Sequence, residues 1–528
     1  MPKHQRIYFH LFLITLLAHG VMIFSKMLMW DSYLVVNAVQ TGSFDMMKDC
    51  YYVTGRRVTI YVLEFLASLP NYIITFKIIS VFIIWGIASL VYKLLNYFNF
   101  FSSTDNFFIA ALTIAAPFYG IWFEMIAITA PFSYLLFLLA CVCYINYIKQ
   151  TRVIDLWLIA ALMLFAISFE LQSFYIFVYV FLGVLFLKNY SHQISIFEQL
   201  VSFIKKNIVL FIFPVIIYVL WNRFFPIDPY FKQYNQIKFE GFATIKMLAY
   251  NFGFSFFKLF ISLPLLFIKA MMGDRVGALM TIIIIGAGMI GLMSRFKIDH
   301  DKLTTPTATF KITVVIGQVI VAVLILLAAL FPYCLVNKPA SALNYDARNA
   351  ILVSLPVAIL LVSLSKFLRL GKPVLVLKII LVVFCICSTY NYFIWNYRFE
   401  KSKQLMTALK QLPLNTMHKT LVFDDQTKPI GNNYFTSYEY NYFMKQITGK
   451  EVYCCMNTRD KMTTDLKHTL DKIEPMKFHF YMTNYVYEND ATNFIQILPS
   501  VQKPAYSFIF IQSVCHQSQT QLIHLQLK

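Results

Sequence analysis

Long apolar runs separated by short polar connections dominate most of this chain. Runs of roughly 17 to 25 apolar residues are long enough to cross the hydrocarbon core of a membrane as helices. The first run follows the basic start MPKHQR and has no small-residue cleavage site, so we expect an uncleaved helix and not a signal peptide. The pattern predicts membrane spans at 7–29, 73–95, 107–128, 131–148, 154–169, 171–187, 207–224, 252–270, 277–294, 311–331, 351–369 and 374–395.

The pattern changes after residue 395, where the chain becomes polar over a length typical of a small domain. The expected strands are 420–425, 477–482 and 505–511, and the expected helices are 398–411, 434–447 and 459–473. The sequence therefore predicts an α-helical polytopic membrane protein over 1–395, with a first outer loop at 30–72. A small extramembrane α/β domain follows at 396–528.

The composition agrees with a membrane protein. The chain is 59% hydrophobic and 13% charged, with a mean hydropathy of +0.63, whereas soluble domains carry about 25% charged residues. A net charge of +19 would suggest a nucleic-acid partner in a soluble protein. In a polytopic protein, basic cytoplasmic loops and contact with anionic membrane lipids account for it, so we expect no nucleic acid as partner.

Lysine and arginine in short loops mark the cytoplasmic side of a membrane. These residues place the N-terminus in the cytoplasm, and they require an even number of crossings within 207–294, where the pattern gives an odd number. The weakest span there is 252–270, which carries Lys258, Pro264 and Lys269 and is open to a re-entrant or amphipathic interpretation. The corrected total is 11 or 13 crossings. The loops 30–72 and 332–350 and the C-terminal domain then face the non-cytoplasmic side. The segment after residue 395 has no Asn-x-Ser/Thr sequon, which favours a bacterial inner membrane over a lumenal location.

The loop after the first span holds acids and an arginine pair: Asp31, Asp45, Asp49, Arg56 and Arg57. A carboxylate at head-group level can take a proton from an acceptor hydroxyl, and arginines can hold a departing phosphate. The plainer alternative is that Asp31 caps a short helix and that the arginines bind lipid head groups.

The segment VTIYVLEFLASL, residues 58–69, is too short to span a membrane and amphipathic enough to lie in the interface. We expect it to cover the first loop and to hold the acids of that loop near the membrane surface.

Two glutamates lie in otherwise apolar surroundings, Glu124 in GIWFEMIA and Glu170 in AISFELQSF. Carboxylates inside a membrane are costly and are therefore functional candidates, although they can also hold helices together by hydrogen bonds. The loop before the span at 351–369 adds Lys338, Asp346 and Arg348. An arginine at a helix start suits a phosphate, and interfacial snorkelling is the alternative.

Asp424 and Asp425 end a predicted strand. An acidic pair could bind a cation, but more often such a pair ends a strand and caps the next element. We expect the structural role.

The architecture resembles the GT-C superfamily of membrane glycosyltransferases. An acid follows the first span, an interfacial helix comes next, and the C-terminal domain lies on the outer side. The string DSYLVVNAVQTGSFDMM…GRRVTIYVLEFLASL is similar to the first loop of bacterial members, among them glucosyltransferases that modify O-antigen. FPYCLVNK…YDARNAILVSLPVAIL and YEYNYFMKQITGK (438–450) resemble segments of uncharacterised bacterial proteins of this type.

This resemblance implies a sugar transfer with inversion, from a polyprenyl-phosphate donor to an envelope glycan or lipid acceptor. The catalytic base would be Asp31, with Asp45 or Asp49 as rivals, and Arg56, Arg57 or Arg348 would bind the phosphate. Glu124 or Glu170 would orient the acceptor or an arginine. Many members have two adjacent acids where this chain has Asp31 followed by Ser32, which leaves the identity of the base open. No cofactor is expected, and a divalent metal is possible without being indicated.

Two other classes remain. A polysaccharide polymerase or ligase would place its large outer loop between spans, whereas this chain has a C-terminal domain. A polyprenyl-linked sugar flippase or another transporter would need polar residues through the depth of the membrane.

Overall fold

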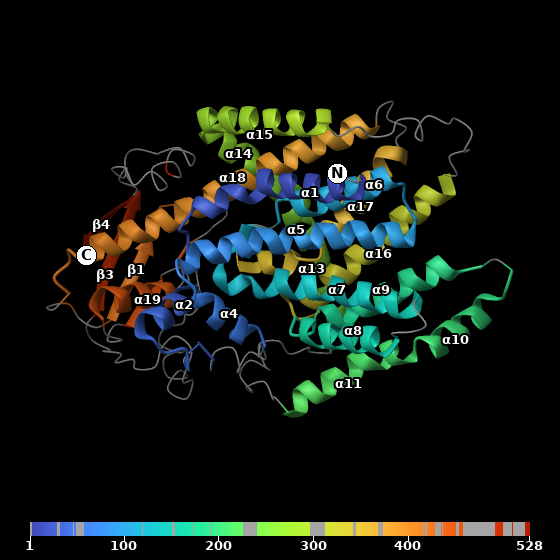
Figure 1. The fold of residues 1–528 in the computed structure, drawn as a ribbon. Coiled ribbons are helices and arrows are strands. Elements are labelled where there is room, and N and C mark those ends of the chain that lie inside the picture. The colour runs from blue at the N-terminus through green and yellow to red at the C-terminus, as the bar shows by residue number, and fades with distance from the viewer. Residues whose placement is uncertain are drawn as a thin grey trace. The chain divides into compact units, whose positions relative to one another are not determined.

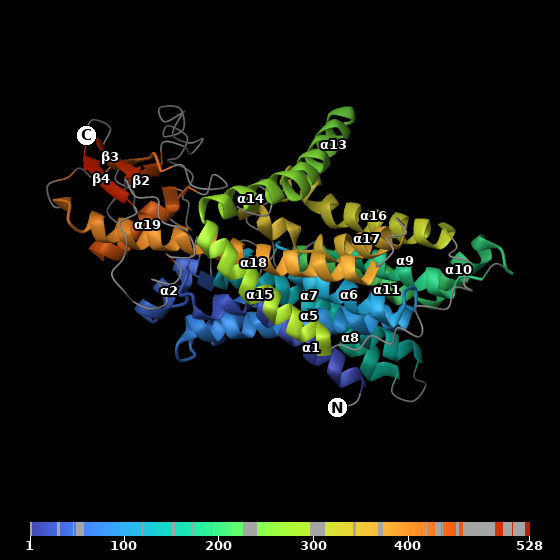
Figure 2. The same cartoon turned by 90° about the horizontal axis from the view of Figure 1, so that it is seen from above.

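The computed structural model shows a mostly helical chain (Figures 1 and 2). The structure describes residues 3–28, 32–45, 47–48, 58–118, 120–149, 154–171, 173–191, 193–224, 240–295, 312–341, 345–367, 373–414, 417, 420–427, 434–435, 437–449, 454–457, 492–499, 509 and 523–527. The chain divides into two compact units. Unit 1 comprises Met1–Phe24, Tyr51–Leu265 and Leu279–Asn391, and unit 2 comprises Ser25–Cys50, Leu266–Ala278 and Tyr392–Lys528.

Unit 1 is a helical bundle in which α5 packs against α1, α6 and α7, and α17 packs against α6 and α16 (Figure 1). Its elements are α1 (Lys3–His19), η1 (Gly20–Phe24), α4 (Thr59–Ala67), α5 (Tyr72–Phe98), α6 (Ser103–Ala115), η2 (Gly120–Phe123), η3 (Met125–Ala127), α7 (Thr129–Lys149), α8 (Ile154–Ser168), α9 (Phe174–Asn189), α10 (Ile196–Lys206), α11 (Ile208–Phe224), α13 (Phe242–Phe257), η4 (Lys258–Ser262), α16 (Ile312–Leu335), η6 (Tyr345–Ala350) and α17 (Ser354–Phe367). Three helices have residues in both units: α14 (Leu263–Gly273), α15 (Arg275–Arg295) and α18 (Pro373–Leu409).

Within the described residues, seven helices are long and apolar enough to cross a membrane, and the bent pair α10 and α11 would make an eighth. Three shorter apolar helices cover Leu156–Ser168, Phe174–Asn189 and Ser354–Phe367. A helical chain with several apolar spans is confirmed, as expected for a membrane protein. The total of 11 or 13 crossings stays a prediction.

The predicted span at 107–128 is wrong as a continuous helix. The α6 helix has 13 residues, a length of about 20 Å, which is short of the roughly 30 Å hydrocarbon core. It begins with a capping box between Ser102 and Asp105 and ends at Ala115, because Ala116 is extended before Pro117. The rest of the predicted span forms the short 3-10 turns η2 and η3.

Other segments take over the hydrogen bonds that α6 gives up where it ends. The His19 Nε2 donates to the Ile114 carbonyl oxygen at 2.7 Å, and Ser388 Oγ donates to the Ala115 oxygen at 2.9 Å. The Asn391 side-chain amide reaches the Pro117 oxygen at 3.4 Å. Irregular backbone is tolerated at membrane depth when protein covers it, and these bonds show how that is done here.

The weakest predicted span, 252–270, lies within a longer apolar helix formed by α13, η4 and α14 over Phe242–Gly273. A π-helical turn occupies Lys258–Ser262, and Leu263 separates it from Pro264, which lacks the backbone N–H of the α-helical ladder. The first turns of α13 extend away from the other helices in Figure 2, and Phe242 is 80% exposed. The amphipathic helix α10 was not predicted.

The predicted interfacial helix at 58–69 is present as α4, Thr59–Ala67, and it packs against α5. Its nine residues are too few to cross a membrane.

Unit 2 contains a four-stranded sheet in the order β2-β1-β3-β4. Strand β1 (Thr420–Asp425) runs parallel to β2 (Cys454–Asn457) and β3 (Thr492–Pro499), and β4 (Ile523–Leu527) is antiparallel to β3. The strand at 420–425 and the helix at 434–447 are confirmed, the latter as α19, Ser437–Thr448. Strands β2, β3 and β4 were not predicted. The predicted elements at 477–482 and 459–473, and all of 505–511 except Ile509, lie outside the described residues.

The predicted separate helix at 398–411 is the continuation of α18, which has 37 residues and runs unbroken from Pro373 to Leu409. No glycine or proline interrupts 396–409, so the change from apolar to charged residues does not end the helix. The helix α2 (Ser32–Thr41) also belongs to unit 2. Its Tyr33 lies in the core with Leu405, Phe423 and Phe443, so residues that follow the first span pack with the C-terminal segment.

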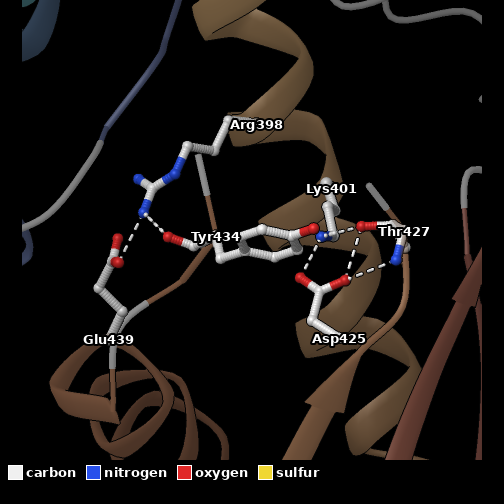
Figure 3. Close-up of polar contacts among 6 residues, drawn as sticks. All are labelled: Arg398, Lys401, Asp425, Thr427, Tyr434 and Glu439. Carbon is white, nitrogen blue, oxygen red and sulfur yellow. Dashed lines mark hydrogen bonds and ion pairs between the residues drawn. The ribbon is translucent and has the colours of Figure 1, made fainter. Parts of the chain in front are cut away.

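Two buried ion pairs join α18 to the rest of unit 2 (Figure 3). The Arg398 guanidinium donates to Glu439 Oε2 at 2.6 Å and to the Tyr434 carbonyl oxygen at 3.1 Å. The Lys401 ammonium donates to Asp425 Oδ2 at 2.5 Å and to Thr427 Oγ1 at 2.6 Å. Asp425 therefore has a structural role at the end of β1, in agreement with the plainer reading of that acidic pair.

Candidate functional site

The candidate site in unit 1 begins with two buried charges, Lys77 near the start of α5 and Glu124 between η2 and η3. Each side chain is 1% exposed, and Glu124 acts on Lys77 as a favourable opposite charge. Phe123, the neighbour of Glu124, has its ring 5.5 Å from that of the fully buried His19. Charged side chains are rarely buried in apolar surroundings, because removing them from water costs several kcal/mol even when they are paired.

The turn η6 includes Asp346 and Arg348, and it packs against η2. It is also tied to Lys338, whose carbonyl oxygen accepts from the Asn349 side-chain amide at 3.2 Å. The Lys338 backbone N–H in turn closes the end of α16 by donating to the Tyr333 carbonyl oxygen at 2.9 Å. The segments that hold Glu124, Lys338, Asp346 and Arg348 are therefore neighbours in unit 1.

Glu170 lies in the turn between α8 and α9, and its Oε1 accepts from the backbone N–H of Val58. Val58 immediately precedes α4 and directly follows Arg57. The same turn contacts the end of α16, since the Tyr333 hydroxyl donates to Ser173 Oγ at 3.4 Å. We call Lys77, Glu124, Glu170, Lys338 and residues 345–350 the helix-end site, because each lies where a helix of unit 1 starts or stops.

The remaining predicted site residues are placed differently. Asp45 belongs to unit 2, where it is exposed and its Oδ2 accepts from Ser43 Oγ at 3.1 Å. Asp31, Asp49, Arg56 and Arg57 lie outside the described residues, as do the side chains of Asp346 and Arg348. Ser32 and Tyr33, which directly follow Asp31, are buried in unit 2.

Sequence reasoning missed Lys77 and His19. Lys77 is a single lysine inside the apolar run ITFKIIS, and His19 follows the apolar run LITLLA. Both are isolated ionisable residues within spans, so the rule that singled out Glu124 and Glu170 also applies to them.

Among the described side chains, the helix-end site combines the carboxylates of Glu124 and Glu170 with the ammonium groups of Lys77 and Lys338, near the ends of apolar helices. Cations of this kind can hold a phosphate, and carboxylates can orient a hydroxyl or a cation. Among the described residues, no group of three His, Cys, Asp or Glu side chains is placed to hold a metal ion. That a divalent metal is possible, without being indicated, stays a prediction from the sequence.

Comparisons of this chain with protein-family models, with curated proteins and with solved structures found no match.

Proposed function

We propose that this protein is a GT-C-type membrane glycosyltransferase, which moves a sugar from a polyprenyl-phosphate donor to an envelope glycan or lipid acceptor. The helix-end site carries the proposal. It gathers acids and cations at one end of an apolar bundle, as a reaction at head-group level requires. In the described part of unit 1, the buried residues among Lys, Arg, Asp and Glu are Lys77, Asp105 and Glu124. Each lies near a helix end, which fits a reaction at the membrane surface better than a pathway through the membrane.

In the proposed reaction, the acceptor hydroxyl attacks the anomeric carbon from the face opposite the lipid phosphate. The bond from that carbon to the phosphate oxygen breaks, and the product is inverted. Asp31 takes the hydroxyl proton. The departing polyprenyl phosphate is stabilised by the positive charge of Arg56, Arg57, Lys338 or Arg348. The protein makes 11 or 13 crossings of a bacterial inner membrane, with its reactive loops and C-terminal segment on the periplasmic side.

A transfer assay tests this class of function. Protein in vesicles is given a panel of polyprenyl-phosphate sugars together with envelope glycan and lipid acceptors. We expect polyprenyl phosphate to appear in equal amount to the sugar gained by the acceptor. Movement of the donor across the bilayer without release would contradict the proposal and indicate a flippase. Growth of a polyprenyl-linked glycan chain would contradict it in favour of a polymerase.

Glu170 is expected to be a positioning residue for the donor phosphate. Its carboxylate accepts a hydrogen bond from the backbone N–H of Val58, the residue after the Arg56–Arg57 pair. A hydrogen bond to a charged group contributes about 1.5–3 kcal/mol. Glu170→Ala should therefore raise the donor KM about 10-fold or more. The kcat should change by less than about 3-fold, because Glu170 does not touch the reacting atoms.

The matched control for Glu170→Ala is Glu198→Ala, which removes an exposed acid from the first turn of α10. The control should leave both kinetic constants near those of the native protein. A fall in kcat at unchanged KM for Glu170→Ala would contradict the positioning role.

A further inference from the structure

Unit 1 contains a partly open apolar cavity of about 290 Å³, lined by residues of α5, α7, α9, α16 and α17. This volume is just below the range of roughly 300–1,000 Å³ that is typical of ligand sites. Rings from the end of α5 and its connection to α6 line it, namely Phe98, Phe100 and Phe101. Apart from the Cys141 thiol, Gln318 supplies the polar lining side chain among the described residues. A cavity of this kind in a membrane protein suits a hydrocarbon chain.

Gln318 gives the cavity one polar anchor. Its amide nitrogen donates to the Phe100 carbonyl oxygen at 2.9 Å. Its Oε1 is buried and accepts no hydrogen bond from the described residues. A buried acceptor without a donor costs about 1–3 kcal/mol, so a ligand that carries a hydroxyl would be favoured there.

Two lysines lie over one aromatic ring beside this cavity. The ammonium of Lys188 is 3.2 Å from the centroid of Tyr97 and that of Lys149 is 4.3 Å from it. Lys188 also donates to the Tyr97 carbonyl oxygen. The Tyr97 ring contacts that of Phe98, with centroids 5.4 Å apart, and Phe98 lines the cavity. The lysine pair, Lys149 and Lys188, therefore borders the apolar space.

The two positive charges repel each other, and Lys149 acts on Lys188 as an unfavourable like charge. Among the described ion pairs, none includes either lysine. Lys366 differs, because it lies 5.9 Å from the Phe101 ring and is already paired with Asp105. An anion bound by Lys149 and Lys188 would relieve their repulsion, and a phosphate has enough acceptor oxygens for both.

The position along α5 fits a membrane surface. The cavity and the lysine pair lie at the end of α5, whereas Lys77 of the helix-end site lies near its start. The separation from Lys77 to Phe98 along the helix is about 30 Å, at 1.5 Å per residue, which equals the thickness of the hydrocarbon core. The lysine pair is thus at head-group level on the face opposite the helix-end site.

We propose that the cavity and the lysine pair form a binding site for one anionic diacyl phospholipid. An acyl chain fills the apolar cavity, and the phosphate lies across Lys149 and Lys188. Basic pockets between membrane helices bind anionic head groups by the same chemistry. This site is independent of the glycosyltransferase proposal and would persist if that proposal failed.

The test is lipid retention by the purified full-length protein, measured by native mass spectrometry. Dioleoyl phosphatidylglycerol is compared with dioleoyl phosphatidylcholine, which has the same chains and no net charge. We expect one phosphatidylglycerol to be retained with at least about 10-fold preference, the scale of one charge-assisted contact. Equal retention of the two lipids by the native protein would overturn the proposal.

Two kinds of variant separate the head-group contact from the acyl-chain contact. Lys149→Gln/Lys188→Gln should reduce the preference to about 3-fold or less, since neither cation remains. Lys205→Gln/Lys206→Gln removes the same charge from the last turn of α10 and should leave the preference unchanged. Gly317→Leu should reduce retention of both lipids, because a side chain at this cavity-lining position would enter open space.

Circular dichroism tests whether each variant is folded. Should the double lysine variant fail to fold, Gly317→Leu decides, and full retention by it would overturn the proposal. Polyprenyl phosphate is the competing source of a lipid phosphate. Displacement of phosphatidylglycerol by an equal concentration of undecaprenyl phosphate would also overturn the proposal.

Discussion

Replacing Asp425 with alanine is expected to lower the local opening free energy of β1 by about 3–5 kcal/mol, the usual cost of breaking a buried ion pair. The Lys401 ammonium is 2.5 Å from Asp425 Oδ2, and the two side chains are 2% and 0% exposed. Asp425 Oδ1 also accepts from the Thr427 backbone N–H at 3.0 Å. Truncation leaves the Lys401 charge buried without this carboxylate, and it removes the bonds that end β1 (Figure 3).

Hydrogen exchange of the β1 and β3 amides, followed by mass spectrometry on the intact protein, reports this free energy for unit 2. Lys403→Ala is the matched control. Lys403 is 39% exposed and pairs with Glu400 at 3.0 Å, so its loss should change the opening free energy by less than about 1 kcal/mol.

The double replacement Lys401→Met/Asp425→Leu should recover more than half of the loss, because it leaves no buried charge from this pair. Amide protection in β1 that is equal in native and Asp425→Ala protein would contradict the structural role of the pair.

The sequence was most informative where local pattern decides structure. The helices α5, α7 and α16 are long apolar runs, so their composition specifies them without reference to partners. Strand β1 and helix α19 were also predicted, because each has its own apolar periodicity. Strands β3 and β4 were missed, since TNFIQILP and IHLQL become strands by pairing with segments distant along the chain.

The early end of α6 was missed for a different reason. The run 107–128 is apolar except for Glu124, and Pro117 and Gly120 interrupt it without adding a charge. Whether such an interruption is tolerated depends on His19, Ser388 and Asn391, which supply hydrogen bonds from other parts of the chain.

The candidate site was predictable in part. Glu124 and Glu170 are isolated acids in apolar sequence, which a scan along the chain detects. The contacts that join them to η6, Lys338 and Val58 depend on how the helices pack, which local pattern does not determine. Tyr97 with Lys149 and Lys188 is a similar case, because the lysines come from two different helices.

The largest expected effect on activity comes from Asp31→Asn. The replacement keeps the size of the side chain and removes its ability to take a proton from the acceptor hydroxyl. Loss of a general base typically costs about 10²–10⁴ in rate. Asp45→Asn should lower the rate by less than about 3-fold, because Asp45 is exposed and its Oδ2 is bonded to Ser43.

Asp49→Asn is the remaining comparison among the first-loop acids. A loss of about 10² in Asp45→Asn or Asp49→Asn, with Asp31→Asn near native, would keep the reaction and move the base to that residue. The folded state of each variant is checked by amide protection in β1, since Ser32 and Tyr33 beside Asp31 are buried in unit 2.

The most direct measurement is the rate at which the native protein and Asp31→Asn release polyprenyl phosphate from polyprenyl-phosphate sugars in the presence of the acceptor mixture. A glycosyltransferase with a first-loop base predicts release by the native protein and a rate lower by about 10² or more in the folded variant. No release from any donor by the native protein would contradict the account.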